Sequence, residues 1–319
     1  MSYVGPIKAL GRCSSAVQWS SFRKCRGAVF AVSQRAASGV ATTPAEEKIE
    51  GKKPRRRFDV PLGMLKADGT SKRFYKAAGV QKVETDDFRT GSRRTAWSLT
   101  LDGRDVRTPA NKLLTLPTED MAMAVALEFE IQDLTILPYT MPITSLAVSA
   151  IDQLARSDVR KSAINDLGRV LRTDLVTFRS TDEDLKKVED EVWGPLCEWA
   201  EKRYKTKVRT DLDFTGTEQP DELLQAVVSD VSGVSDWRLT ALDQVSRVTG
   251  SCLVSIALGF GFYDGDQALT AARLQEQYQA DRYGRVEASG LGGHDVDHSD
   301  MRTRLAACWT FHRLLPRDK

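Results

Sequence analysis

The chain has 319 residues, of which 41% are hydrophobic and 28% charged, with a formal net charge of +2. This composition is typical of a globular protein with one large domain or two ordinary ones. The longest apolar run, residues 252–262, includes a serine and two glycines. It is much shorter than the roughly 20 residues of a membrane-spanning helix, so no span is expected.

Residues 1–45 have the composition of a leader sequence. They contain no Asp or Glu but six basic residues and seven serines, which is typical of an organellar transit peptide. A disordered basic tail is the alternative, and the serine content leaves a chloroplast leader open beside a mitochondrial one. Without this leader, 40 basic residues face 44 acidic ones, which argues against nucleic acid as the partner. Residues 46–71 are polar and predict a flexible lead-in.

A small β-rich domain is predicted over residues 72–140. Trp97, Leu99 and Leu101 alternate with polar residues, as in a strand with one buried face. The following Asp102-Gly103 pair supplies the positive φ angles of a two-residue hairpin turn. Segments 73–82 and 113–116 have the pattern of flanking strands. A β meander or a small, partly closed barrel is therefore expected.

A larger, all-helical domain is predicted over residues 141–319, which makes the fold class α+β. Thr118 caps a helix that runs to about Gln132, and Pro142 opens a second helix through Ile151. Ser157 and Thr181 are also expected caps, the latter in a capping box with Asp184. The remaining predicted helices are 158–172, 182–204, 221–231, 236–262 with a break at Gly250, 266–283 and 299–314.

Residues 193–204 are the most distinctive amphipathic segment. Pro195 suits a first helical turn, where its missing N–H has no intrahelical partner to lose. Leu196, Trp199 and Arg203 then recur at helical spacing, so one face can bury an aromatic ring. On physical grounds alone the segment is a core helix with Trp193 and Trp199 as anchors.

Motifs for catalysis are scarce. The sequence contains no G-x-x-x-x-G-K-[ST], G-x-S-x-G or H-E-x-x-H motif, and all three histidines follow residue 293. The glycines of residues 259–265 have the wrong spacing for a dinucleotide loop and predict a turn. Cys197, Cys252 and Cys308 are widely separated, so they are expected to be buried apolar residues without a disulfide or zinc.

One cluster leaves a metal-dependent hydrolase as the alternative function. His294, Asp295, Asp297 and His298 could ligate a divalent cation. A glycine-rich loop that leads into a helix explains the same residues without a metal, because acidic groups are favourable near a helix N-terminus. We favour this second interpretation and expect no metal and no other cofactor.

The helix predicted at residues 266–283 offers a polar surface to a partner. Leu274 and Tyr278 belong to one apolar stripe, whereas Glu276 and Gln279 lie three residues apart on another face. Arg273 precedes Glu276 by three residues, so an ordinary exposed ion pair is the plain interpretation. A polar contact presented to a partner is the functional one.

Several blocks together resemble one protein family, the mitochondrial assembly factors that chaperone the alpha subunit of the ATP synthase catalytic head. The blocks are Arg73–Lys76 (R-F-Y-K), Leu101–Arg104, Thr108-Pro109, Leu116–Thr118, Met141-Pro142, Asp152, Asp174, Arg179, Trp193–Trp199 (similar to W-D-P…E-W) and Leu274–Gln279 with Tyr283-Gly284 (similar to L-E-E-E-Y-Q…W-G). They occur in the family's order over about residues 73 to 315. Departures are Phe129 and Tyr283 in place of tryptophan, Gly194 in place of aspartate, and a glycine-rich insertion at 289–293.

The resemblance implies a chaperone without enzymatic activity, located in the mitochondrial matrix. It implies that the protein holds the unassembled alpha subunit until the beta subunit replaces it, and that it is monomeric. The family glutamate at the position of Glu276 is regarded as essential. Accordingly, we expect Arg273, Glu276, Gln279 and Tyr283 to bind the partner, and the expected structural anchors are Asp102, Gly103, Phe129, Trp193, Pro195 and Trp199.

Overall fold

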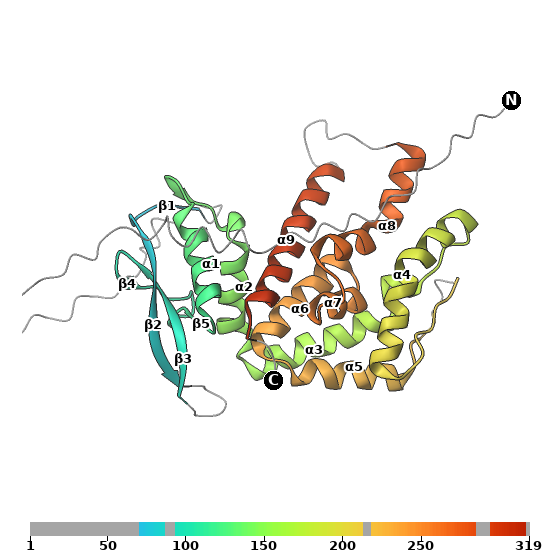
Figure 1. Cartoon of the computed structure of the whole chain (residues 1–319), viewed down its shortest axis with the longest axis horizontal. Coiled ribbons are helices and arrows are strands. Elements are labelled where there is room, and N and C mark those ends of the chain that lie inside the picture. The colour runs from blue at the N-terminus through green and yellow to red at the C-terminus, as the bar shows by residue number, and fades with distance from the viewer. Residues whose placement is uncertain (1–69, 87–92, 213–217, 285–293, 317–319) are drawn as a thin grey trace, which may run out of the picture. The chain divides into compact units, whose positions relative to one another are not determined.

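The structure is a computed structural model that describes residues 70–86, 93–212, 218–284 and 294–316. The predicted transit peptide (1–45), nearly all of the lead-in (46–71) and the glycine-rich insertion (289–293) lie outside these residues. The expected α+β fold class is confirmed, because the strands fall between residues 71 and 136 and helices dominate the rest of the described chain (Figure 1). In these ranges the strands form open sheets and not a closed barrel.

The larger sheet is built on a long antiparallel hairpin. Strand β2 (Ala78–Asp86) pairs with β3 (Arg93–Leu101) along its full length, and β3 also pairs with the short strands β4 (Arg104–Asp105) and β5 (Thr115–Leu116). The turn between β3 and β4 has φ angles of 49° at Asp102 and 74° at Gly103. The predicted two-residue hairpin turn is therefore confirmed.

The strand expected at residues 73–82 is wrong at its beginning. The chain forms only β1 (Ser71–Lys72), which pairs with β6 (Thr135–Ile136), and returns to a strand at Ala78. Between them, the Asp102 carboxylate accepts hydrogen bonds from the backbone N–H groups of Lys76 and Ala77, each at 3.0 Å. These N–H groups, that of Ala77 first, lower the pKa of Asp102. The Asp102 side chain thus binds the backbone N–H groups that would otherwise pair with a neighbouring strand.

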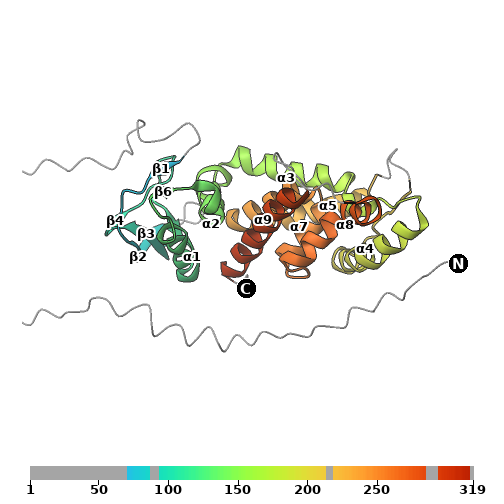
Figure 2. The ribbon, with the colours of Figure 1, turned by 90° about the horizontal axis from the view of Figure 1, so that it is seen from above.

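Helix α1 (Glu119–Glu130) packs against β2 and β3 (Figure 2). Thr118 caps it as predicted, because its hydroxyl accepts from the backbone N–H of Met121 at 3.2 Å. Met121 and Val125 are completely buried in the main core. The buried Glu128 carboxylate accepts from the backbone N–H groups of Ile143 and Thr144 and so ties α1 to the next helix.

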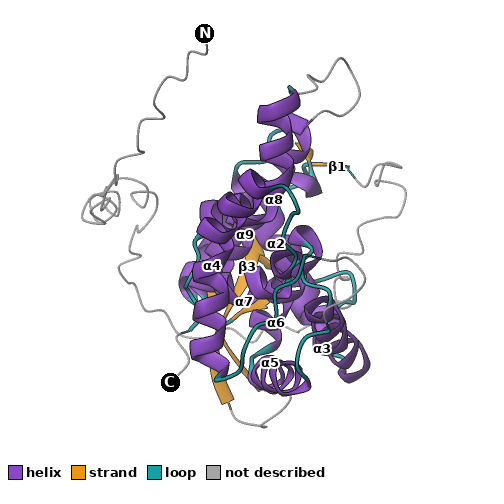
Figure 3. Ribbon diagram, turned by 90° about the vertical axis from the view of Figure 1, so that its right-hand side faces the viewer, coloured by secondary structure: helices purple, strands orange, loops and turns teal. Residues whose placement is uncertain are grey.

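The helical part packs around α7. Every residue of α7 (Cys252–Gly259) is buried, and the helix contacts α3, α4, α6, α8 and α9 (Figure 3). The remaining helical elements are η3 (Pro138–Thr140), α2 (Pro142–Ser149), the π-helical turn η4 (Ala150–Leu154), α3 (Ser157–Arg172), η5 (Leu175–Thr177), α4 (Glu183–Tyr204), α5 (Asp221–Gly233), α6 (Asp236–Thr249), α8 (Gly265–Tyr283) and α9 (His294–Leu314).

Several helix boundaries test the local predictions. Gly250 has a φ of 67° and ends α6, which confirms the predicted break. Ser157 is not a cap but the first residue of α3. Asp182, and not Thr181, caps α4, because its carboxylate accepts hydrogen bonds from the backbone N–H groups of Asp184 and Leu185. Helix α9 starts at His294, earlier than the predicted residue 299.

The three cysteines of the described residues are free and buried, as expected. Burial raises the pKa of each thiol, to about 12 for Cys308, so none is activated as a nucleophile. Within the described ranges, every helix is too short or too polar to traverse a lipid bilayer.

A buried carboxylate joins η5 to α7. Asp174 has no exposed surface, and its oxygens accept from the Ser251 hydroxyl at 2.5 Å and the Leu253 backbone N–H at 2.9 Å. Burial raises the pKa of Asp174 from its ordinary 3.8 to about 6, against the opposing effect of these donors. The free energy of unfolding therefore depends on the protonation of this group.

Because the pKa of Asp174 is raised, the free energy of unfolding should depend on pH. The Asp174→Asn variant should lack this dependence. Since the native protein keeps the Asp174 proton to higher pH than the unfolded chain, the stabilisation is full below about pH 4 and lost as the pH rises through 6. Urea unfolding at several pH values should show wild-type stability, relative to the variant, falling by about 1 kcal/mol per pH unit in this window. Parallel curves for the two proteins would contradict the assignment.

Candidate functional site

The first tryptophan of the 193–204 segment joins α4 to α8. Trp193 is fully buried, and its indole N–H donates to the Ala271 carbonyl of α8 at 2.9 Å. The Arg179 guanidinium lies 5.4 Å from the centre of the Trp193 ring and pairs with Asp190 at 2.8 Å. The hydrogen bond of the indole N–H joins α4 to α8, and the Arg179 cation, which precedes α4 in the chain, helps to fix the orientation of the Trp193 ring.

Pro195 is not in the first helical turn, so that prediction is wrong. It lies inside α4, which already begins at Glu183. The proline ring disfavours a helical conformation at the residue before it through clashes with the backbone N–H and the Cβ of that residue. Gly194 occupies this position and has no Cβ, which removes one of the clashes that oppose a helix through Pro195.

The other end of α4 packs on the turn that follows α7. Trp199 stacks on Phe262 with ring centres 5.0 Å apart, and Arg203 lies 3.8 Å from the centre of the Phe260 ring. Gly261 has a φ of 79° in this turn. The predicted turn at residues 259–265 is therefore confirmed, and it serves to position aromatic rings against α4.

A buried glutamate links α4 to α8 next to Trp193. Glu189 has no exposed surface; one carboxylate oxygen accepts from the Gln275 amide at 2.8 Å and the other from the Ser180 backbone N–H at 2.7 Å. A buried carboxyl group is tolerated only when hydrogen bonds replace its water. Glu189 therefore holds the middle of α8 in one position.

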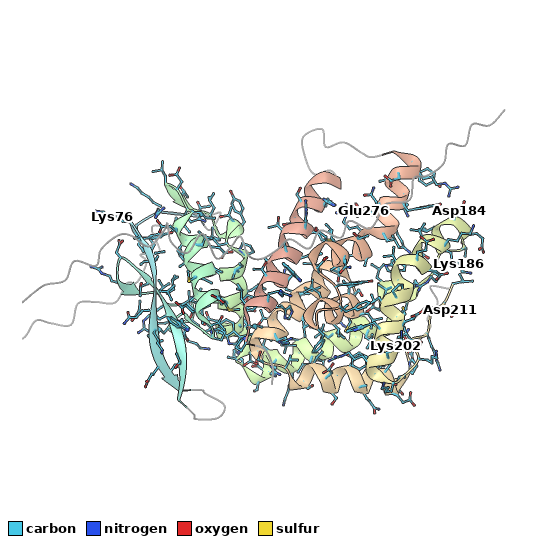
Figure 4. The ribbon with its side chains drawn as sticks, in the orientation of Figure 1. Lys76, Asp184, Lys186, Lys202, Asp211 and Glu276 are labelled. Carbon is cyan, nitrogen blue, oxygen red and sulfur yellow. The ribbon has the colours of Figure 1, made fainter. Side chains whose placement is uncertain are left out.

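The outer turns of α8 carry the predicted partner-binding residues. Arg273 is buried and donates to the carboxylate of Glu276, whose side chain is 38% exposed. Figure 4 labels Glu276 on α8 and Asp184 near the start of α4. Gln279 is exposed, and Tyr283 is 79% exposed. We call Glu276, Gln279 and Tyr283 the α8 edge.

A second ion pair braces the α8 edge from α4. Arg282 donates to the Asp182 carboxylate at 2.5 Å and to the Tyr278 hydroxyl at 3.1 Å. The Arg282 guanidinium also lies 5.8 Å from the centre of the Tyr283 ring. The backbone donors of the α4 cap, with Arg282 in support, lower the pKa of Asp182. The end of α8 is thus held by charge while its outer face remains accessible.

Sequence reasoning missed Asp182, Glu189, Gln275 and Arg282. One signal was present, because Glu189 falls on the apolar stripe of α4 between Leu185 and Trp193. A charged residue at a buried helical position requires a partner. That partner, Gln275, is 86 residues away in the sequence. Helical periodicity relates only nearby residues, so it could not identify Gln275.

The expected anchor Phe129 lies at the end of α1. Its carbonyl accepts from the Tyr75 hydroxyl at 2.7 Å, and the two rings meet edge to face with centres 5.9 Å apart. Burial, ahead of the neighbouring charges, raises the pKa of Tyr75 to about 12, so the hydroxyl remains a donor at neutral pH. This contact joins the loop before β2 to α1.

The described side chains offer no ligand set for the metal ion that the alternative hypothesis requires. In those residues no group of three or more His, Cys, Asp or Glu is close enough to hold a metal ion. Asp297 and His298 are described on α9, whereas the side chains of His294 and Asp295 lie outside the described set.

These contacts define a helical scaffold in which buried polar groups hold an accessible helix edge in a fixed orientation. Residues 72–201 match the family model described as ATP12 chaperone protein. The crystal structure of Atp12 from Paracoccus denitrificans matches with a TM-score of 0.67 and 28% identity, over 76% of this chain and 97% of that chain. A putative chaperone from Agrobacterium tumefaciens shares the fold at the same TM-score and 24% identity, over 78% of this chain and 87% of its own.

Two curated relatives are named as mitochondrial proteins. Protein atp12 of Schizosaccharomyces pombe is 25% identical over 73% of this chain and 85% of its own length. Protein ATP12 of Saccharomyces cerevisiae is 26% identical over 65% and 76%. The chain is therefore similar to the ATP12 chaperones in both sequence and fold, and the family resemblance is confirmed.

The network predicts different effects for its buried and exposed carboxylates. Glu189→Ala should lower the free energy of unfolding by about 3 kcal/mol, because it leaves buried donors unpaired and opens a cavity. Glu276→Gln should lower it by only about 1 kcal/mol, because the Glu276 side chain is 38% exposed and the glutamine carbonyl can still accept from the buried Arg273. Urea unfolding of both variants measures the difference. Equal losses in the two proteins would contradict this division of roles.

Proposed function

We propose that this chain is an assembly chaperone of the mitochondrial ATP synthase, which binds the unassembled alpha subunit in the matrix until the beta subunit replaces it. The match to the ATP12 chaperone family model and the similarity to mitochondrial relatives support this proposal. The acid-free leader, rich in serine and basic residues, is consistent with import. The chaperone acts as a monomer and makes or breaks no covalent bond.

The physical need for such a protein follows from ring assembly. A subunit of a heteromeric ring exposes apolar interface before its neighbour arrives, and exposed apolar surface aggregates. A holding chaperone must cover that surface reversibly and leave when the true partner competes. Binding through a limited set of contacts on a rigid scaffold satisfies both conditions.

The observation that carries the proposal is the braced α8 edge. Arg273 is buried and holds the Glu276 carboxylate at the surface, where it can accept hydrogen bonds from a client. Tyr283 adds an exposed aromatic ring, a side chain enriched at protein interfaces. Gln279 lies one helical turn from both. We assign Glu276, Gln279 and Tyr283 to the client contact and Arg273 to positioning.

Glu276→Gln provides the test, measured as binding of purified alpha subunit and suppression of its aggregation without ATP. Loss of one charge-assisted contact should weaken binding by about tenfold or more, with the fold intact. The matched control is Glu198→Gln, which removes an exposed helical carboxylate paired with Lys202. This control should bind the alpha subunit like the wild type.

Two results would contradict different parts of the proposal. Failure of the wild-type protein to bind the alpha subunit at physiological salt would refute the assigned client. Normal binding by both glutamate variants, alongside protection by the wild type, would instead remove the α8 edge from the contact.

A further inference from the structure

Helix α1 exposes an apolar stripe on the face opposite its packing against the sheet. Met123, Leu127 and Ile131 are 42%, 60% and 64% exposed, and Leu134, just beyond the helix, is 76% exposed. The first three are spaced by four residues and therefore lie one above another. A contiguous row of large exposed apolar side chains is informative because single ones are common and rows are not. We call these four residues the α1 stripe.

Acidic residues flank the α1 stripe. Glu119, Asp120, Glu130 and Asp133 are exposed, and the sequence from 119 to 134 contains no Lys or Arg. Glu130 is partly neutralised by Arg73, at 3.7 Å. The local charge therefore favours an approaching cation over an anion.

The α1 stripe rests on a fixed support. The Thr118 hydroxyl at the start of α1 donates to the Leu314 carbonyl of α9 at 2.7 Å. In the last turn of α1, the Glu128 carboxylate accepts from α2 and the Phe129 carbonyl accepts from the Tyr75 hydroxyl. A surface held at three points loses little conformational freedom when a partner binds.

We propose that the α1 stripe is a second docking surface for the client, and that it receives a segment whose aliphatic side chains are flanked by Lys or Arg. This inference rests on the proposed function, since it assigns a further contact to the same chaperone. The aliphatic groups cover the stripe and the basic groups meet the acidic rim. Two separate contacts on one client raise the effective affinity while each remains weak enough to release.

Two double variants test the two components of this surface. Leu127→Ser with Ile131→Ser removes apolar area at exposed positions, where substitutions have small effects on stability. Glu119→Lys with Asp120→Lys reverses two of the four acidic charges that flank the stripe. The matched controls are Leu212→Ser, at another exposed leucine, and Asp221→Lys with Glu222→Lys, which reverses the same two charges in the first turn of α5.

Peptide binding provides a readout that is independent of the alpha subunit. The probes are three fluorescent peptides of equal length: an amphipathic Lys–Leu peptide, a Glu–Leu peptide of the same pattern, and a Lys–Ser peptide. Only the Lys–Leu peptide should bind the wild-type protein. Both α1 double variants should weaken it by about tenfold or more, and neither control should.

Three results would overturn the inference. They are equal binding of the Glu–Leu peptide, unchanged Lys–Leu binding by the α1 variants, and a wild-type dimer that becomes monomeric in Leu127→Ser with Ile131→Ser. The last would identify a second copy of this chain as the occupant. If the peptide binds at α1 but the wild-type protein does not protect the alpha subunit from aggregation, only the proposed client is refuted. If the wild-type protein protects the alpha subunit and the α1 variants bind the peptide and the alpha subunit like the wild type, only the α1 docking surface is refuted.

Discussion

The fold depends on carboxyl groups that are buried and must be hydrogen bonded. Glu128, Asp174 and Glu189 each sit in the interior, and each accepts from donors on a different element. A carboxyl group without such donors would cost several kcal/mol in an apolar interior. The three groups therefore restrict how α1 meets α2, how η5 meets α7 and how α4 meets α8. The orientation of the exposed helix edges follows from these buried constraints.

This arrangement suits a protein whose function is to bind and release. The interior polar groups make the scaffold rigid, whereas the α8 edge and the α1 stripe keep polar and apolar groups accessible. Rigid presentation lowers the entropic cost of binding. Exposed side chains that contribute little to folding can then be specialised for the client. Buried and exposed carboxylates of the same chain thus have separate roles.

The sequence predicted the features that local geometry determines. The turn at Asp102-Gly103 and the break at Gly250 depend on positive φ angles, which glycine favours. The Thr118 cap depends on a single backbone N–H group three residues away. Contacts between distant residues could not be predicted from spacing. The bond between Glu189 and Gln275 is the example: periodicity marks the first as out of place and cannot identify the second. The three-residue spacing predicted the ion pair between Arg273 and Glu276, but only the structure shows that Arg273 is buried and that the pair is not an ordinary exposed one.

Hydrogen–deuterium exchange of the chain, with and without unassembled alpha subunit and in the absence of nucleotide, tests the central claim most directly. We expect slower backbone exchange in the second half of α8, around Glu276 to Tyr283, when the alpha subunit is present. Unchanged exchange in this half of α8 when the alpha subunit is bound would contradict it.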